Sequence, residues 1–416
     1  MNQAQSTREL HSRARILVIS MYLAPCKEVG GKRFTFLSRY LSKWCDDYHI
    51  LARRERASIG DATAFNGNVH RVRMFPHYPP IRSDIRGIRR LVVRAWERWL
   101  CLVDTGTGFV IPATMKGIHL CRKHRLNVVI VTVPDFSSII AATIVTKVTR
   151  ARLILDYRDP WTNHRTEYPK PFGRWLSRFF ERTAIRHATA TVVCTDIMRD
   201  NFVRAFGDIA PSYVEVIHNG FEDYEERSRK RFDADRTTMI YAGNFHGRRR
   251  LSVIALAMAE MAHSGDIAPD NFRFHIFSQL GREDYALMDR FGVRDLIEVH
   301  KPVPYHEIKK IMSAADILFL PSGDEVAYAI PYKFFDYLSV RRPILAVAPR
   351  ASSIGCLMRQ IDCGELAEFG EYDEIRRAIR TLLKKTKTYS FKGSQNFRWK
   401  NSVRQYYNVI ECVINT

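Results

Sequence analysis

The sequence lacks the cysteine patterns that hold small secreted domains together. Its eight cysteines stand singly along 416 residues, and no CxxC pair or Cys/His group has the spacing of a zinc site. No convincing Asp-x-Asp motif of the metal-binding kind is found either. The sequence therefore predicts neither a disulfide framework nor a bound metal, and a reducing environment is expected.

Long apolar runs are missing as well. After the charged start of the chain only residues 16–20 form an apolar stretch, which is too short for the core of a signal peptide. The longest apolar run, residues 128–146, is interrupted by Pro134 and Asp135, so we expect a strand, a loop and a helix there instead of a membrane span. A cytoplasmic protein without an export signal is expected.

Acidic residues are scarce in the first half of the chain. Residues 1–200 hold 34 lysines and arginines against 16 aspartates and glutamates, whereas residues 201–416 hold 31 against 28. The first half thus carries most of the formal net charge of +21. A one-sided basic surface indicates an anionic partner: membrane headgroups, a lipid-linked phosphate or nucleic acid.

Part of this charge lies in residues 82–103, where arginines recur every four residues and apolar side chains recur every three or four. On a helix the two sets occupy opposite faces. The pattern predicts a basic amphipathic helix on an anionic membrane surface, and a cationic helix packed on its own domain is the alternative. The residues expected at the membrane are Arg86, Arg90, Arg94, Trp96 and Trp99.

The rest of the chain alternates short β-branched runs with amphipathic segments, which is typical of parallel sheets covered by helices on both faces. The length favours two domains, and a charged stretch poor in apolar residues at 221–236 places the junction near residue 220. The expected strands are residues 15–20, 47–51, 128–132, 152–156, 191–194, 214–217, 238–242, 272–277, 297–300, 317–319 and 344–348.

Residues 331–345 join the start of a helix to a buried strand. Pro331 suits the first helical turn, where its missing N–H is not needed, and Lys333 with the N–H groups behind Pro331 suits an anionic diphosphate. Asp336 lies one turn later on the same face and can accept hydrogen bonds from a ribose diol. A capped surface helix with one Lys/Asp pair is the alternative.

Three strand-to-helix turns carry further candidate groups. Gly30 and Gly31 allow a close backbone approach, although an ordinary turn explains them equally well. Residues 156–161, DYRDPW, either meet a ligand or form an Asp–Arg pair with Trp161 over the core. Residues 248–250 are three arginines that suit a phosphate, with a solvated basic face as the alternative.

Five segments occur in an order and spacing that resemble the retaining glycosyltransferases of family 4. They are ILVIS with the later glycine pair, DYRDPW, VIHNGFED, YAGNFHGRR and IPYKFFDYLSVRRPIL. The resemblance is greatest to the bacterial members that build O-antigen, capsule and exopolysaccharide. It implies an α/β protein of GT-B architecture, with two doubly wound Rossmann-like domains facing across a cleft.

The resemblance also implies how the chain divides. Residues 1–220 would form the N-terminal, acceptor-side domain and residues 221–390 the C-terminal domain that binds the nucleotide sugar. Residues 391–416 would form a helical segment that packs back on the N-terminal domain.

The donor-binding residues follow from the same resemblance. Asp336 stands where the family has the second glutamate of its Glu-x7-Glu motif, which binds the nucleotide ribose. The first glutamate would fall on Tyr328, so Asp324 or Glu325 would replace it. The donor-binding residues implied are Gly30, Gly31, Asn244, Arg248, Arg250, Glu325, Pro331, Lys333 and Asp336.

The chemistry implied is transfer of a sugar from a nucleoside diphosphate sugar to an acceptor hydroxyl, with retention of configuration. Positively charged protein groups beside the departing diphosphate stabilise its negative charge in such a reaction, and neither a metal nor a cofactor is expected. The acceptor proton would go to the departing phosphate or to Asp135, Asp159 or His164. The expected partners are a nucleotide sugar, a lipid-linked glycan acceptor and an anionic membrane surface, and no nucleic acid is expected. The protein is expected to be peripheral on the inner face of the cytoplasmic membrane.

Two other functions stay open. The missing first glutamate is compatible with a catalytically inactive GT-B scaffold subunit of a polysaccharide assembly complex. The net charge is compatible with a nucleic-acid-modifying transferase, although no nucleic-acid recognition fold is evident.

Overall fold

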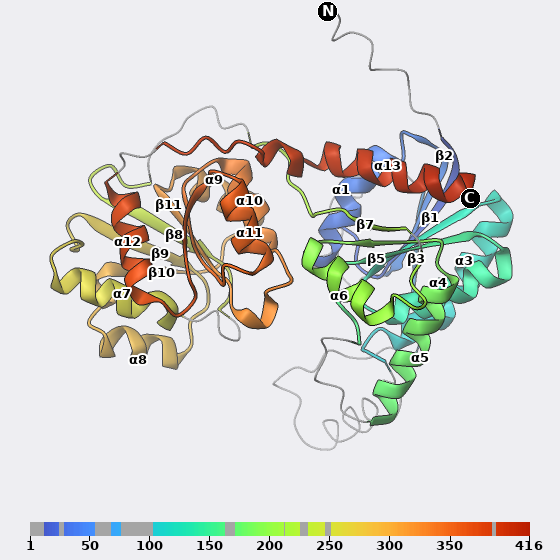
Figure 1. The fold of residues 1–416 in the computed structure, drawn as a ribbon, viewed down its shortest axis with the longest axis horizontal. Helices are drawn as coiled ribbons and strands as arrows, with labels where there is room; N and C mark the ends of the chain where they lie inside the picture. The colour runs from blue at the N-terminus through green and yellow to red at the C-terminus, as the bar shows by residue number, and fades with distance from the viewer. Residues whose placement is uncertain are drawn as a thin grey trace, which may run out of the picture. The chain divides into compact units, whose positions relative to one another are not determined.

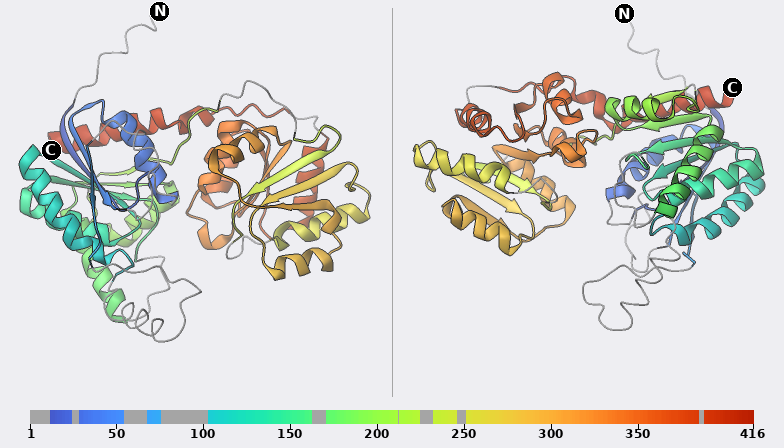
Figure 2. Two further views of the ribbon diagram at one scale, coloured as in Figure 1. Left: turned by 180° about the vertical axis from the view of Figure 1, so that it is seen from behind. Right: turned by 60° about the horizontal axis from the view of Figure 1, so that its bottom comes forward.

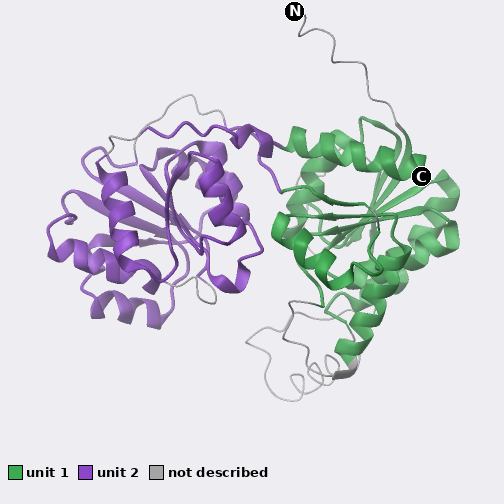
Figure 3. Ribbon diagram, viewed as in Figure 1, with its two compact units in different colours: residues 1–218, 399–416 green, residues 219–398 purple. Residues whose placement is uncertain are grey.

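The computed structural model describes most of the chain. The described residues are 12–24, 29–54, 68–75, 103–162, 171–211, 213–224, 232–245, 251–384 and 388–416. They form two compact units (Figure 3): Met1–His218 together with Trp399–Thr416 makes unit 1, and Asn219–Arg398 makes unit 2. The chain therefore leaves unit 1 after His218 and returns to it at Trp399.

Unit 1 is built on a seven-stranded parallel sheet in the order β3-β2-β1-β4-β5-β6-β7 (Figure 1). The central strand β4 is buried at every position, which explains its unbroken β-branched sequence. The strands are β1 (Ser12–Ser20), β2 (Cys45–Arg53), β3 (Asn68–Val72), β4 (Val128–Val133), β5 (Arg152–Tyr157), β6 (Ala190–Val193) and β7 (Val214–Val216).

Helices cover this sheet on both faces. The last helix of the chain, α13, lies beside α1 (Figure 1), where Trp399 stacks on Phe36 with ring centres 5.6 Å apart. Tyr406 of α13 meets Phe34 of α1 edge to face at 5.8 Å. The helices are α1 (Lys32–Leu41), α3 (Val110–His124), α4 (Ser137–Thr149), α5 (Pro171–His187), α6 (Asp196–Phe206) and α13 (Trp399–Asn415).

Unit 2 is built on a six-stranded parallel sheet in the order β10-β9-β8-β11-β12-β13. The strands are β8 (Thr237–Ala242), β9 (Phe272–Phe277), β10 (Ile297–His300), β11 (Ile317–Pro321), β12 (Ile344–Val347) and β13 (Gly364–Ala367).

Helices lie on both faces of this second sheet (Figure 2), and a separate hydrophobic cluster holds them to each face. Helices α7, α8 and α12 pack on one face, and α9, α10 and α11 pack on the other. The helices are α7 (Ser252–His263), α8 (Arg282–Arg290), α9 (Tyr305–Ala314), α10 (Tyr332–Val340), α11 (Ser353–Gln360) and α12 (Tyr372–Leu383).

The prediction of two doubly wound parallel sheets is confirmed, and a strand is present at each of the eleven expected positions. Two further strands, β3 and β13, were not predicted, and each forms an edge of its sheet. In both sheets the connections change direction next to the first strand, between β1 and β4 in unit 1 and between β8 and β11 in unit 2. Ligands of open α/β sheets bind beyond the carboxyl ends of the strands at such switch points.

No helix in the described part of the chain is both long enough and apolar enough to cross a bilayer. The predicted amphipathic helix at 82–103 lies outside the described residues, apart from its final residue, Val103.

Candidate functional site

Lys333 lies at the switch point of unit 2, on the helix that follows β11. Its Nζ atom donates a hydrogen bond to the hydroxyl of Tyr241 at 2.9 Å and lies 4.1 Å from the centre of that ring. The Tyr241 hydroxyl in turn donates to the carbonyl of Asn244 at 2.9 Å. These contacts bring two of the expected donor-binding residues, Lys333 and Asn244, together through Tyr241, which was not singled out from the sequence.

Gly243 follows β8 and faces the same lysine. Its φ of +128° belongs to a backbone region that side chains rarely adopt, and an added Cβ would lie 2.2 Å from Lys333 Nζ. The backbone conformation therefore favours glycine at this position, and a side chain here would also force the end of the lysine to move.

Pro331 immediately precedes helix α10. We expected it inside the first turn, but its backbone (φ −55°, ψ 136°) is extended, and α10 begins at Tyr332. The Pro331 carbonyl accepts a hydrogen bond from the Phe334 N–H at 2.9 Å, which starts the helix. The positive end of the helix dipole and the Lys333 ammonium thus lie within the first turn, where an anion is favoured.

Asp336 lies one turn further along α10 and is almost completely buried. One oxygen of its carboxylate accepts a hydrogen bond from the Tyr305 hydroxyl, and its backbone carbonyl accepts one from the Ser339 hydroxyl at 2.6 Å. Burial, and then the neighbouring negative charge of Asp336, raise the pKa of Tyr305, so this hydroxyl stays protonated. Tyr305 therefore orients the carboxylate expected to bind ribose.

Of the remaining donor-binding residues expected in unit 2, the structure describes Glu325 but not the two arginines. Glu325 lies in the short 3-10 helix Asp324–Val326 after β11, and its carboxylate folds back over Gly323. Tyr328 is the residue at which the resemblance places the family's first glutamate, and its backbone carbonyl accepts a hydrogen bond from the Ser353 hydroxyl at 2.9 Å. Two expected residues lie outside the described residues: Arg248 and Arg250.

The switch point of unit 1 carries the glycine pair and Asp135. Gly30 and Gly31 form a 3-10 turn between β1 and α1. Asp135 follows β4, and its carboxylate accepts a hydrogen bond from the Tyr22 hydroxyl at 3.1 Å. The ring of Tyr22 also borders Gly30, because an added Cβ there would lie 3.3 Å from it. The structure thus brings Asp135 and Gly30 to one edge of the sheet.

Arg158 holds this edge together. Its guanidinium donates to the carbonyls of Val133 at 2.9 Å and Pro134 at 2.8 Å, and also to that of Gly30. It therefore joins the ends of β4 and β5 to the glycine turn that precedes α1. Arg158 belongs to the predicted DYRDPW segment, but its partners could not be predicted. They are backbone carbonyl groups, which every residue has, so the residue types do not identify them.

Asp156 and Trp161 of DYRDPW have structural roles. Asp156 forms a buried ion pair with Arg33 of α1 at 3.0 Å, and Arg33 also donates to the Ile217 carbonyl at 2.8 Å. Trp161 is buried and stacks on Phe136 with ring centres 5.2 Å apart. The alternative reading of this segment, an Asp–Arg ion pair with Trp161 packed over the core, is therefore present. The arginine of the pair is Arg33 of α1 and not Arg158.

Of the two other expected proton-relay residues, Asp159 and His164, only the first lies in the described part of the chain. Asp159 follows Arg158 and is partly exposed. His164 lies outside the described residues, as do the expected membrane residues Arg86, Arg90, Arg94, Trp96 and Trp99.

An apolar pocket of unit 1, lined in part by Trp161, includes one buried carboxyl group, that of Glu181. Glu181 accepts a hydrogen bond from the Thr162 N–H at 3.2 Å and another from the Thr162 hydroxyl. Burial raises the pKa of Glu181 to about 7. The other lining residues are mainly apolar: Tyr157, Pro160, Trp161, Val193, Met198, Asn201, Phe202 and Phe206.

The two sheets define a protein of the GT-B class, as solved structures of the same fold show. Sucrose-phosphate synthase from Thermosynechococcus elongatus aligns over 97% of this chain and 100% of its own, with a TM-score of 0.66 at 12% identity. The Anabaena protein HepE, solved in complex with UDP and glucose, aligns over 96% and 100% with a TM-score of 0.63 at 14% identity. The predicted fold class is confirmed.

A family match within unit 1 specifies the class further. Residues 31–220 match the family described as glycosyl transferase 4-like domain. A curated relative, alpha-maltose-1-phosphate synthase of Mycolicibacterium smegmatis, is 22% identical over 219 residues. That match covers 48% of this chain and about half, 53%, of the relative. The chain thus has the GT-B fold, and its residues 31–220 are similar to a glycosyl transferase 4-like domain, in line with the sequence resemblance.

Proposed function

We propose that this protein transfers a sugar from a nucleoside diphosphate sugar to an acceptor hydroxyl and retains the anomeric configuration. The observation that carries the proposal is the position of Lys333, which lies at the start of α10 and contacts Tyr241 next to Gly243. An ammonium group and a helix N-terminus at a switch point together stabilise the negative charge that develops on a departing diphosphate.

The other expected site residues have matching roles in this proposal. Asp336, oriented by Tyr305, binds the ribose of the donor, and Glu325 contributes to sugar recognition in place of the glutamate that Tyr328 replaces. Gly30 and Gly31 border the donor phosphates, and Arg248 and Arg250 neutralise them. The acceptor proton goes to the departing phosphate or to Asp135, Asp159 or His164.

Helix α5 supports an acceptor that is presented by a membrane. Its side chains Trp175 and Phe179 are 60% and 52% exposed and stack on each other with ring centres 6.0 Å apart. Arg174 and Arg178 are exposed on the same two turns. Aromatic and cationic groups on one exposed helix favour the interface of an anionic bilayer. We propose a lipid-linked intermediate of a bacterial surface polysaccharide as acceptor, with the protein peripheral to the inner face of the cytoplasmic membrane.

The experiment that tests the function measures donor use directly. The purified chain is screened against UDP-, GDP- and dTDP-sugars by thermal shift, because selective ligand binding raises Tm. Sugars that stabilise the protein are then assayed for slow hydrolysis or transfer, and NMR of the released sugar gives the anomeric configuration. Stabilisation and turnover with one donor class is the expected result.

The same measurements separate the two alternatives. A folded protein that neither binds nor hydrolyses any nucleotide sugar in the panel overturns the proposal and favours a scaffold subunit. Salt-dependent retention on DNA, with sugar transfer to bases, identifies a nucleic-acid-modifying transferase.

A further inference from the structure

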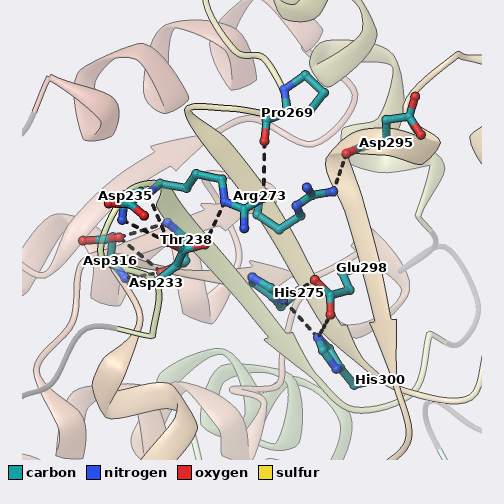
Figure 4. Close-up of polar contacts among 11 residues, drawn as sticks. Asp233, Asp235, Thr238, Pro269, Arg273, His275, Asp295, Glu298, His300 and Asp316 are labelled. Carbon is teal, nitrogen blue, oxygen red and sulfur yellow. Dashed lines mark hydrogen bonds and ion pairs between the residues drawn. The ribbon is translucent and has the colours of Figure 1, made fainter.

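We propose that His275, Glu298 and His300 form a binding site for a divalent transition-metal ion, specifically Zn²⁺. The three residues lie on adjacent strands of unit 2, at the β10 edge of its sheet, and Figure 4 shows both imidazoles and the carboxylate turned toward one another. Neither the family match nor the donor site involves these residues.

The pairing of β9 with β10 dictates this arrangement. Glu298 is the register partner of His275, and His300 follows Glu298 by two residues. Side chains two apart on a strand share a face, as do register partners on neighbouring strands. The three donor groups are therefore held by regular sheet structure and not by loops.

The distances between the donor atoms are within about 0.4 Å of those around a tetrahedral ion, and the ion would replace the hydrogen bond between the two imidazoles. His275 Nδ1 and His300 Nε2 are 3.0 Å apart, and the Glu298 carboxylate oxygens lie 3.7 Å from the first and 3.5 Å from the second. Ligands about 2.1 Å from a tetrahedral Zn²⁺ are separated from one another by about 3.4 Å. Two imidazoles with one carboxylate are a donor set that zinc uses, and the fourth position stays open for water.

Neighbouring rings hold the two imidazoles in place. His300 stacks on Phe277 with ring centres 4.4 Å apart, and Phe232 meets His275 edge to face at 4.6 Å. Such an apolar surround orients ligand side chains before the ion arrives. Glu298 is 53% exposed and His300 26%, so an ion can enter from solvent, whereas His275 forms the buried floor of the site.

A second cluster, in unit 1, provides a comparison. Its Asp47 Oδ1 is 3.0 Å from His49 Nε2, and Asp47 Oδ2 is 3.6 Å from His124 Nδ1. Asp47 and His49 lie on β2, but His124 is the last residue of α3, so strand pairing alone does not hold this cluster. We therefore assign the zinc site to unit 2 and use His124→Ala as the matched control, since it removes one histidine from a cluster of similar composition.

The test measures zinc binding by the full chain. After chelator treatment and dialysis, the wild type is titrated with ZnCl₂ in a calorimeter, and bound metal is counted by elemental analysis. We expect one equivalent to bind with a rise in Tm, and Co²⁺ to give the visible absorption of a four-coordinate site. His300→Ala and Glu298→Gln lose that equivalent and the Tm rise, whereas His124→Ala keeps both.

Two results overturn the proposal: unchanged zinc stoichiometry and affinity in His300→Ala, or loss of the bound equivalent in His124→Ala alone. Because Glu298 and His300 lie at an exposed sheet edge, their variants are expected to fold, and an unchanged far-UV circular dichroism spectrum without zinc verifies this. Nucleotide-sugar binding by Glu298→Gln is measured in parallel. If this variant loses zinc but binds the sugar donor as the wild type does, the zinc site and the proposed function are tested independently.

Discussion

Lys333 Nζ lies 4.1 Å from the centre of the Tyr241 ring and 2.9 Å from its hydroxyl oxygen. A cation placed over an aromatic face is attracted to it, and the hydrogen bond adds direction. Because Tyr241 belongs to β8 and Lys333 to α10, one side-chain pair ties the start of the helix to the first strand of unit 2. The lysine is therefore in place before any donor binds.

Replacement of Lys333 by alanine removes this positive charge. We expect Lys333→Ala to lower the rate of donor turnover by roughly 100-fold, the cost typical of losing one group that stabilises developing negative charge. Steady-state kinetics with the donor found in the nucleotide-sugar screen measure the effect. Lys310→Ala, at an exposed position on α9, is the control and should match the wild type. Wild-type turnover in Lys333→Ala would exclude the lysine from the reaction.

An alanine at position 243 should displace the lysine. Both Gly243→Ala and Gly265→Ala put a side chain on a positive-φ backbone, at +128° and +76°, so each should lose about 1 kcal/mol of stability or more. Only at position 243 does the new Cβ meet another side chain. Nucleotide affinity, measured by calorimetry, should fall in Gly243→Ala and stay unchanged in Gly265→Ala. Equal affinities in the two variants would contradict the role given to this contact.

Tyr305 should affect donor binding through Asp336. A hydrogen bond to a charged group is worth about 1.5–3 kcal/mol, so Asp336→Asn, which weakens a direct contact with the ribose, should lower donor affinity about 10-fold or more. Tyr305→Phe removes only the bond that orients this carboxylate, so it should lower donor affinity by a smaller factor. The control is Tyr285→Phe on α8, whose ring is partly exposed. If Asp336→Asn abolishes binding while Tyr305→Phe binds normally, Asp336 acts without help from the tyrosine.

Glu181 should make the stability of the protein depend on pH. Its carboxyl titrates near 4.5 in the unfolded chain and at about 7 in the folded one because of burial. Between these values the folded state holds a proton that the unfolded state lacks, so the free energy of unfolding falls as pH rises, by about 3 kcal/mol in total. Urea denaturation at pH 5 and pH 8 should show this loss in the wild type and a smaller loss in Glu181→Gln. Identical losses would indicate that the carboxyl is not buried in solution.

Charge reversal on α5 should weaken membrane binding. Each basic residue near an anionic surface contributes about 1 kcal/mol, so Arg174→Glu with Arg178→Glu should lower affinity for phosphatidylglycerol vesicles by at least roughly 30-fold. Co-sedimentation over a range of salt concentrations measures this. The control, Arg282→Glu with Arg290→Glu, changes the same number of charges on α8 of unit 2. Equal binding of the wild type to neutral phosphatidylcholine vesicles would contradict an electrostatic contact.

The central strands could be predicted from sequence because burial on both faces demands continuous apolar runs. The edge strands β3 and β13 carry no such signal: β3 is exposed or half-buried throughout, and β13 begins at Gly364 with a φ of +156°. Their place in the sheets comes from pairing with a neighbour, which a local pattern does not encode.

The residues of the candidate site could likewise be predicted only in part. Lys333, Asp336 and the glycines could be proposed because residue type and position in a turn already suggest their chemistry. Tyr241 and Tyr305 could not, because each contributes through a partner distant in the sequence: Lys333 for one, Asp336 for the other. His275 and Glu298 are likewise brought together only by strand register.

The return of the chain to unit 1 at Trp399 has a consequence for biosynthesis. Trp399 and Tyr406 are completely buried and pack on α1, so that surface of unit 1 stays open to solvent until α13 has been made. Every residue of unit 2 is translated before that point. On the ribosome, the half that begins first is therefore completed last, and a nascent chain that stalls just short of α13 exposes an apolar patch to chaperones and proteases.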